Sequence, residues 1–108
     1  MTKAEKQVLK RVYLEQKETK VYYRKLAQAL EDKYPVYEAG SPEQKELKEF
    51  RGYDMKYSAI ENATKELIKE LAQGQDVHQW LGITIDDIET IIEHIDKCVA
   101  RYMQWKNL

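Results

Sequence analysis

A stripe of apolar side chains near the C-terminus constrains the fold of this 108-residue chain more than any other feature. Its members are Ile85, Ile88, Ile92, Ile95, Val99 and Tyr102, and Ile91, Cys98 and Trp105 widen it. The spacing of three and four residues matches the helical repeat, which indicates a helix with one core-facing side rather than a strand. Thr84 and Asp87 resemble a capping box directly before the stripe. The sequence therefore predicts a helix over 85–106 whose apolar side is the centre of the core.

Turn-forming residues are scarce, because the chain contains only 4 glycines and 2 prolines. An all-β domain of this size needs a turn about every ten residues, which these residues cannot supply. Charged residues make up 34% of the chain and hydrophobic residues 43%, a balance typical of globular rather than disordered proteins. These features predict one all-α domain over 1–108, a small helical bundle of three to five helices.

A long middle helix is predicted from 42 to about 73. Ser41 and Pro42 are typical of a helix start, and Gly74 is typical of a helix end. The apolar positions expected to face inward are Leu47, Phe50, Tyr53, Tyr57, Ile60, Leu67 and Leu71. A short helical turn over 76–81 is expected to connect this helix to the last one.

The middle segment has two alternative descriptions. A glycine inside a helix costs about 1 kcal/mol relative to alanine, and Gly52 lies in the interior of this one. The segment is therefore either one long bent helix or two helices over 42–51 and 55–73. In both cases, Glu61 and Lys65 are expected to form an i,i+4 ion pair on the outer face.

The N-terminal segment, 1–33, is helical by composition, but its apolar stripe is interrupted. The apolar positions are Leu9, Val12, Tyr23, Leu26 and Leu30. Gln16 and Thr19 occupy the same side between them, so we expect a broken helix that restarts at Thr19. The residue before a proline avoids the helical conformation, and the helix is therefore expected to end before Pro35. A loop over 35–41 follows.

Charge is unevenly distributed although the net charge is only -1. Residues 1–25 contain eight Lys or Arg and three Glu, whereas residues 76–96 contain six acidic residues and no Lys or Arg. Such asymmetry favours recognition of a partner, and it also helps the two ends of one chain to pack together. The candidate protein-binding residues are Asp86, Glu89, Glu93, Asp96, Tyr53 and Tyr102. The two tyrosines are included because 8 Tyr and 2 Trp exceed the needs of a small core, and tyrosine is common at binding surfaces.

Sequence patterns of catalytic sites were not found. The chain has no glycine-rich phosphate loop, no cysteine pair and no HExxH or Gly-x-Ser-x-Gly motif. Glu89, Glu93 and His94 superficially resemble part of a carboxylate-rich metal site, but such ligands must point inward, where isoleucines are expected. We therefore expect no enzyme activity, no metal and no cofactor.

Nucleic-acid binding is the alternative function. Lys20, Tyr22, Arg24 and Lys25 alternate basic and aromatic side chains, a combination suited to phosphate contact and base stacking. The region also resembles a helix-turn-helix. The connection after it is longer than the usual turn of that motif, and the following helix has no excess of positive charge.

The leading hypothesis is a small, non-catalytic regulator or inhibitor that acts by binding another protein. Homodimerisation would bury the excess apolar surface if the C-terminal stripe is wider than three helices can cover. A single cysteine, the lack of an apolar N-terminal stretch and the shortness of every apolar run predict a cytoplasmic protein without a membrane span.

Overall fold

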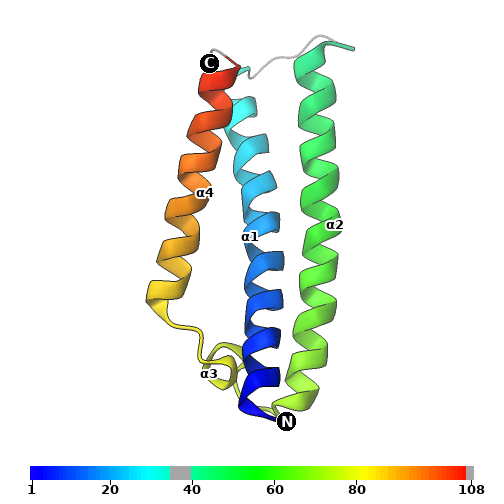
Figure 1. Ribbon diagram of the computed structural model, residues 1–108. Helices are drawn as coiled ribbons and strands as arrows, with labels where there is room; N and C mark the ends of the chain where they lie inside the picture. Colours follow the sequence, from blue (N-terminus) through cyan, green and yellow to red (C-terminus); the bar gives the residue numbers. More distant parts are fainter. Residues whose placement is uncertain (35–39, 107–108) are drawn as a thin grey trace.

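The computed structural model describes residues 1–34 and 40–106. Its helices are α1 (Lys3–Lys33), α2 (Pro42–Leu71), α3 (Val77–Leu81) and α4 (Ile85–Trp105). Figure 1 shows α1 between α2 and α4, with α1 and α4 running in one direction and α2 in the other. The described part of the chain has no strand and is elongated, with extents of 51 × 24 × 17 Å. The predicted all-α bundle is confirmed.

Short polar side chains cap the N-terminus of every described helix. Thr2, Ser41, Asp76 and Thr84 each accept a hydrogen bond from the backbone N–H three residues later. At α4 the bond is reciprocal, because the Thr84 N–H also donates to the Asp87 carboxylate at 2.9 Å. Gly82 ends α3 with a φ of 73°, a conformation that glycine adopts without strain. These contacts confirm the predicted helix starts at 42 and 85 and the short turn between α2 and α4.

The cap of α4 supplies a first prediction. Replacing Thr84 with alanine removes the acceptor for the Asp87 N–H and is expected to lower the free energy of unfolding by about 1 kcal/mol. Urea denaturation followed by far-UV circular dichroism measures the change. Thr84→Ser keeps the hydroxyl and serves as the control, so an equal loss in both variants would contradict the role of the cap.

Helix α1 is continuous, and the prediction of a break near Thr19 is wrong. The Thr19 hydroxyl donates to the Glu15 carbonyl at 2.9 Å, a bond that a threonine makes from inside a helix. Lys17 and Lys20, on either side of Thr19, bind a carboxylate of α2. The interrupted stripe therefore marks a polar layer in one helix, not the end of a helix.

Helix α2 is also continuous, so the alternative of two helices over 42–51 and 55–73 is wrong. Gly52 is exposed and lies inside the helix. The Ser58 hydroxyl donates backward to the Asp54 carboxylate at 3.2 Å instead of capping a new helix. Packing against α1 along its length holds α2 together, which offsets the cost of one glycine. The helix ends at Leu71.

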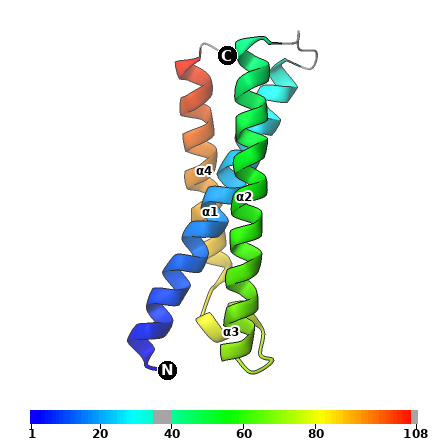
Figure 2. The ribbon, with the colours of Figure 1, turned by 90° about the vertical axis from the view of Figure 1, so that its right-hand side faces the viewer.

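A cluster of buried side chains lies where α1, α2 and α3 meet, at the end of the bundle near the N-terminus (Figures 1 and 2). It consists of Tyr13, Ile68, Val77 and Leu81, with Leu9, Trp80 and Ile83 packed against it. Helix α4 contributes one fully buried residue, Ile95, while Ile85 is 77% exposed and Trp105 is 74% exposed. The prediction that the α4 stripe is the centre of the core is therefore wrong. The physical reason is that, among the described residues, the backbone of α4 packs against α1 but not against α2.

In the second half of α2, the side that faces the core is not the predicted one. Ile68 and Ala72 are buried, whereas Leu67 is 63% exposed and Leu71 is also exposed. Apolar residues occupy two neighbouring rows of this helix, and its packing against α1 and α3 selects the row that contains Ile68.

Glu61 lies in the same buried row, with 5% of its surface exposed. Lys20 of α1 forms an ion pair with its Oε2 atom, and the Lys17 Nζ atom lies 4.0 Å from its Oε1 atom. The predicted surface pair between Glu61 and Lys65 is therefore wrong. A buried carboxylate held by two lysines of α1 takes its place.

Two further predictions concern the end of α1 and the absence of a membrane-spanning helix. The Tyr34 N–H donates to the Leu30 carbonyl and closes α1 before Pro35, as predicted. Most of the predicted loop over 35–41 lies outside the described residues. Within the described ranges, none of the helices is at once long enough and apolar enough to cross a bilayer.

Candidate protein-binding surface

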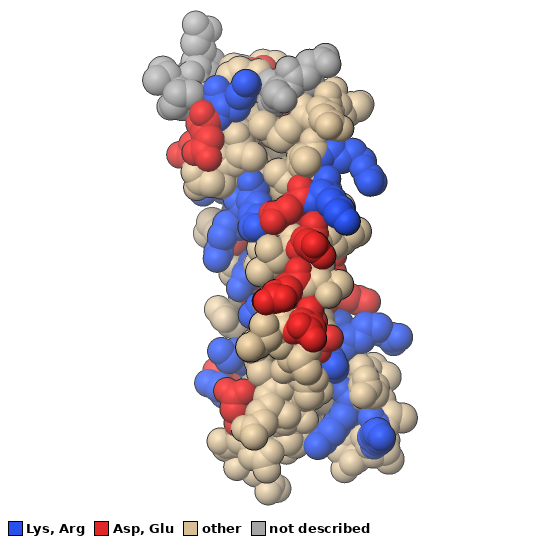
Figure 3. Space-filling view, turned by 90° about the vertical axis from the view of Figure 1, so that its left-hand side faces the viewer, with Lys and Arg blue, Asp and Glu red and all other residues tan. Residues whose placement is uncertain are grey.

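Four of the six predicted protein-binding residues lie together on the outer side of α4. Asp86, Glu89, Glu93 and Asp96 are all exposed, and their spacing of three and four residues places them along one side of the helix. We call these four residues the acidic surface. Figure 3 views the molecule from the side of α4 and shows an acidic band with basic side chains on both flanks.

The carboxylates of α4 differ in their partners. Lys25 of α1 binds Asp96 at 2.6 Å, and Lys10 binds Asp87 at 3.2 Å. The backbone N–H of Thr84, followed by Lys10, lowers the pKa of the Asp87 carboxyl group. Asp86, Glu89 and Glu93 form no ion pair with any residue that the structure describes. The acidic surface therefore has three carboxylates whose charge no described lysine or arginine neutralises at contact distance.

Apolar side chains border the acidic surface. Ile92 is exposed and lies with the four carboxylates around one shallow hollow. Ile85, at the start of the helix, is the most exposed large apolar residue of the described chain. Combined charge and uncovered apolar area are typical of surfaces that contact another protein.

The two predicted tyrosines lie elsewhere. Tyr53 of α2 packs against Tyr23, with their ring centroids 4.8 Å apart. The Tyr102 hydroxyl donates to the Glu46 carboxylate at 2.5 Å, and burial together with this bond raises the pKa of Tyr102. The rings of Tyr23, Phe50, Tyr53, Tyr57 and Tyr102 are linked by contacts between neighbours. Much of the tyrosine excess therefore packs the helices together and does not join the acidic surface.

Glu46 ties the end of α4 to α2. The Lys106 ammonium lies 2.5 Å from the Glu46 carboxylate, which also accepts the Tyr102 hydrogen bond. Burial raises the pKa of the Glu46 carboxyl group, but the hydrogen bonds from Lys106 and Tyr102 outweigh it, and the pKa is lowered. The contact fixes the C-terminal end of α4 and leaves its acidic side facing outward.

The basic residues proposed for nucleic acid are engaged within the protein. Arg24 binds Asp54 of α2 at 3.2 Å, Lys25 binds Asp96 of α4, and Lys20 binds Glu61. Tyr22 lines a hollow between α1 and α4. The segment therefore supplies interhelical ion pairs in this structure, and no observation favours it as a surface for phosphate groups.

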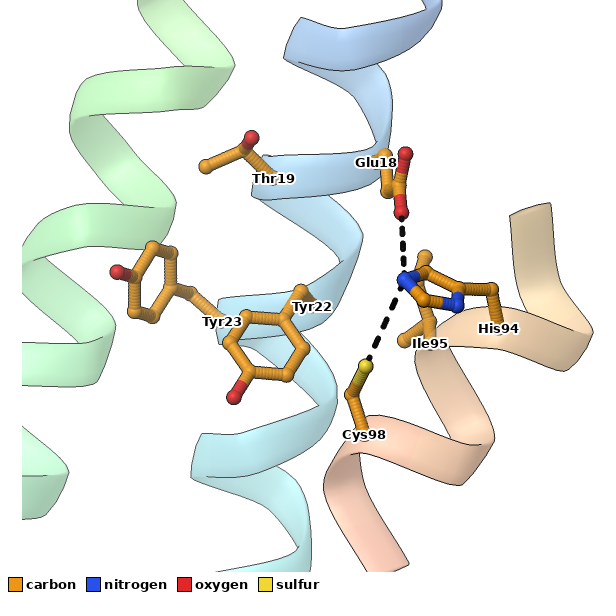
Figure 4. Close-up of a pocket in the computed structure, with 7 residues that line it drawn as sticks. All are labelled: Glu18, Thr19, Tyr22, Tyr23, His94, Ile95 and Cys98. Atoms are coloured by element: carbon orange, nitrogen blue, oxygen red, sulfur yellow. Dashed lines mark hydrogen bonds and ion pairs between the residues drawn. The ribbon is translucent and has the colours of Figure 1, made fainter. Parts of the chain in front are cut away.

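The hollow next to Tyr22 contains an arrangement that the sequence interpretation missed (Figure 4). The Cys98 Sγ atom lies 3.7 Å from the His94 Nε2 atom, and the Glu18 Oε1 atom lies 3.6 Å from the same nitrogen. The spacing of four residues between His94 and Cys98 was the available signal. A catalytic triad needs its nucleophile and its orienting carboxylate on different ring nitrogens. This geometry does not meet that requirement. Within the described ranges, no group of three or more His, Cys, Asp or Glu side chains is arranged so that it could hold a metal ion.

The fold and these surfaces define a small all-α protein with an exposed acidic helix. Comparison of the chain with protein-family models, with curated proteins and with solved structures gave no match.

Proposed function

We propose that this protein is a non-catalytic regulator or inhibitor that binds a basic surface of another protein through the acidic surface of α4. The observation that carries the proposal is the set of carboxylates at Asp86, Glu89 and Glu93, which form no ion pair with any described residue. They share an exposed side of one helix with Ile92, next to Ile85. Charges in this arrangement steer a basic partner, and the isoleucines add apolar contact after encounter.

The energetics of α4 support a partner of positive charge. Like charges three or four residues apart destabilise a helix by a few tenths of a kcal/mol per pair. Asp86, Glu89 and Glu93 carry this cost without a described counter-charge. A cationic surface would remove it on binding, and the interaction would weaken with salt because exposed charges are screened.

The proposal is tested by mapping and then measuring the contact. A photo-crosslinking amino acid at Thr90, an exposed position in the hollow that the acidic surface borders, should capture the partner in extracts of the native host. The same group at the exposed Lys56 of α2 is the negative control. With the partner purified, Asp86→Lys/Glu89→Lys/Glu93→Lys should weaken binding at least tenfold at physiological salt, because attraction becomes repulsion.

A matched variant separates a local effect from the change in total charge. Glu49→Lys/Glu66→Lys/Glu70→Lys replaces three exposed glutamates of α2 and changes the net charge by the same amount. It should leave the affinity within about twofold, since these residues are outside the acidic surface. If both triple variants bind alike, or if the Thr90 probe captures no protein that the Lys56 probe misses, the proposed surface is wrong.

A further inference from the structure

A continuous furrow runs between α1 and α4. It consists of three adjoining hollows. The first, lined by Leu14 and Ile91, shares Glu18 with the second. The second shares Tyr22 and Cys98 with the third, which extends to Trp105. Because neighbouring hollows share wall residues, the three form one furrow along the two helices.

The walls of the furrow are largely apolar. Leu14 and Ile91 lie toward one end, and Tyr22 and Cys98 lie near the middle. Trp105 at the other end has 74% of its surface uncovered. Tryptophan and tyrosine provide much of the binding energy where proteins recognise one another. An uncovered Trp105 at the end of an apolar furrow therefore provides an anchor for a ligand that covers it.

An arginine side chain lies at each end of the furrow. Arg11 lines the first hollow and Arg101 lines the third, and both are exposed. Neither side chain forms an ion pair or a hydrogen bond with any described residue. The neighbouring Lys10 differs, since it binds Asp87 and donates to the Gly82 carbonyl at 3.0 Å. The furrow thus presents two available guanidinium groups, which bind carboxylates well.

We propose that the furrow binds an amphipathic helix of a partner protein that has an apolar side and acidic residues at both ends. The length of the bound helix follows from the length of the furrow along α1 and α4. At 1.5 Å per residue, α1 spans about 17 Å from Arg11 to Tyr22, and α4 spans about 21 Å from Ile91 to Trp105. A helix of about 11–14 residues fills this length and packs beside the three long helices of the bundle. This site is independent of the proposed function, because it uses other residues and selects the opposite charge.

A second copy of this chain fits the furrow poorly. Its most acidic exposed helix is α4, which would have to supply carboxylates at both ends. The acidic residues of α4 end at Asp96, and the rest of the helix carries Lys97 and Arg101. One end of such a helix would therefore place a cation against a cation. The charge pattern selects a different protein.

The test uses two synthetic peptides that lack tryptophan. Both are 14-residue helices with leucines along one side, and one carries glutamates in its first and last turns where the other carries lysines. Trp80→Phe leaves Trp105 as the reporter. The glutamate peptide should bind saturably and shift the Trp105 emission to shorter wavelength. Its affinity should exceed that of the lysine peptide by about tenfold, and Arg11→Glu/Arg101→Glu should reverse the preference.

A charge-matched variant and a check of assembly complete the experiment. Lys45→Glu/Lys48→Glu changes the net charge by the same amount on exposed positions of α2 and should preserve the preference. Circular dichroism confirms that each variant is folded. Equal binding of the two peptides, no binding of either, or no reversal in the arginine variant would overturn the proposal. Sedimentation showing a dimer that Arg11→Glu/Arg101→Glu dissociates would also overturn it, because a second copy would then occupy the furrow.

Discussion

Replacing Tyr13 with alanine is expected to lower the free energy of unfolding by about 4 kcal/mol. Tyr13 is 1% exposed and packs with Ile68, Val77 and Leu81 at the junction of α1, α2 and α3. Its ring also meets the His78 ring at a centroid distance of 5.9 Å. Removing it leaves a cavity that three helices would have to close. Because domains of this size are stable by only about 5–15 kcal/mol, much of the stability would be lost. Urea denaturation monitored by far-UV circular dichroism measures the effect.

Two control variants show whether the loss comes from this cluster. Tyr13→Phe keeps the ring and should cost about 1 kcal/mol or less. Ile85→Ala removes an apolar side chain from the predicted core stripe, but that residue is largely solvated, so the change should stay within about 0.5 kcal/mol. A loss at Ile85 as large as that at Tyr13 would show that α4 forms the main core after all.

Replacing Glu61 with alanine is expected to lower the free energy of unfolding by about 2–3 kcal/mol. The change leaves the ammonium groups of Lys17 and Lys20 without their carboxylate, and removing one partner of a buried ion pair costs about 3–5 kcal/mol. The loss expected here is smaller than that range because both lysine side chains keep some contact with solvent. The same denaturation measurement gives the value.

A double replacement tests the physical reason for the Glu61 effect. Glu61→Leu/Lys20→Met removes the closest ion pair and substitutes apolar side chains, which proteins often tolerate without loss. This variant should recover most of the stability that Glu61→Ala loses. If Glu61→Ala and Glu61→Leu/Lys20→Met were equally stable, the carboxylate would lie in solvent and not between α1 and α2.

Local sequence features predicted where the helices start and end. Ser41 with Pro42, and Thr84 with Asp87, satisfy backbone N–H groups within their own first turn, so a short stretch of sequence determines these starts. The predicted break at Thr19 and the alternative of a break at Gly52 were wrong for one shared reason. A polar residue or a glycine weakens a helix locally, and contacts with other helices decide whether the helix breaks.

The candidate surface could be predicted only in part. The side shared by Asp86, Glu89 and Glu93 follows from the spacing of three and four residues in a helix. The pairing of Asp96 with Lys25 could not be predicted, since 71 residues separate them in the chain. For the same reason, the sequence could not predict that Arg11 and Arg101 line one furrow, because only the packing of α1 beside α4 brings them to it.

The sequence alone determined the properties that depend on neighbours along the chain: the all-α class, the caps, and the acidic side of the last helix. Only the tertiary structure decided which apolar rows are buried. The stripe that begins at Ile85 has the strongest pattern in the chain, yet all four residues of the buried cluster come from the other three helices. Helical spacing specifies which residues share a side. Burial depends on which helices come close enough to cover that side. Among the described residues, the backbone of α4 packs against α1, whereas α2 meets α4 through side chains near the C-terminal end of α4.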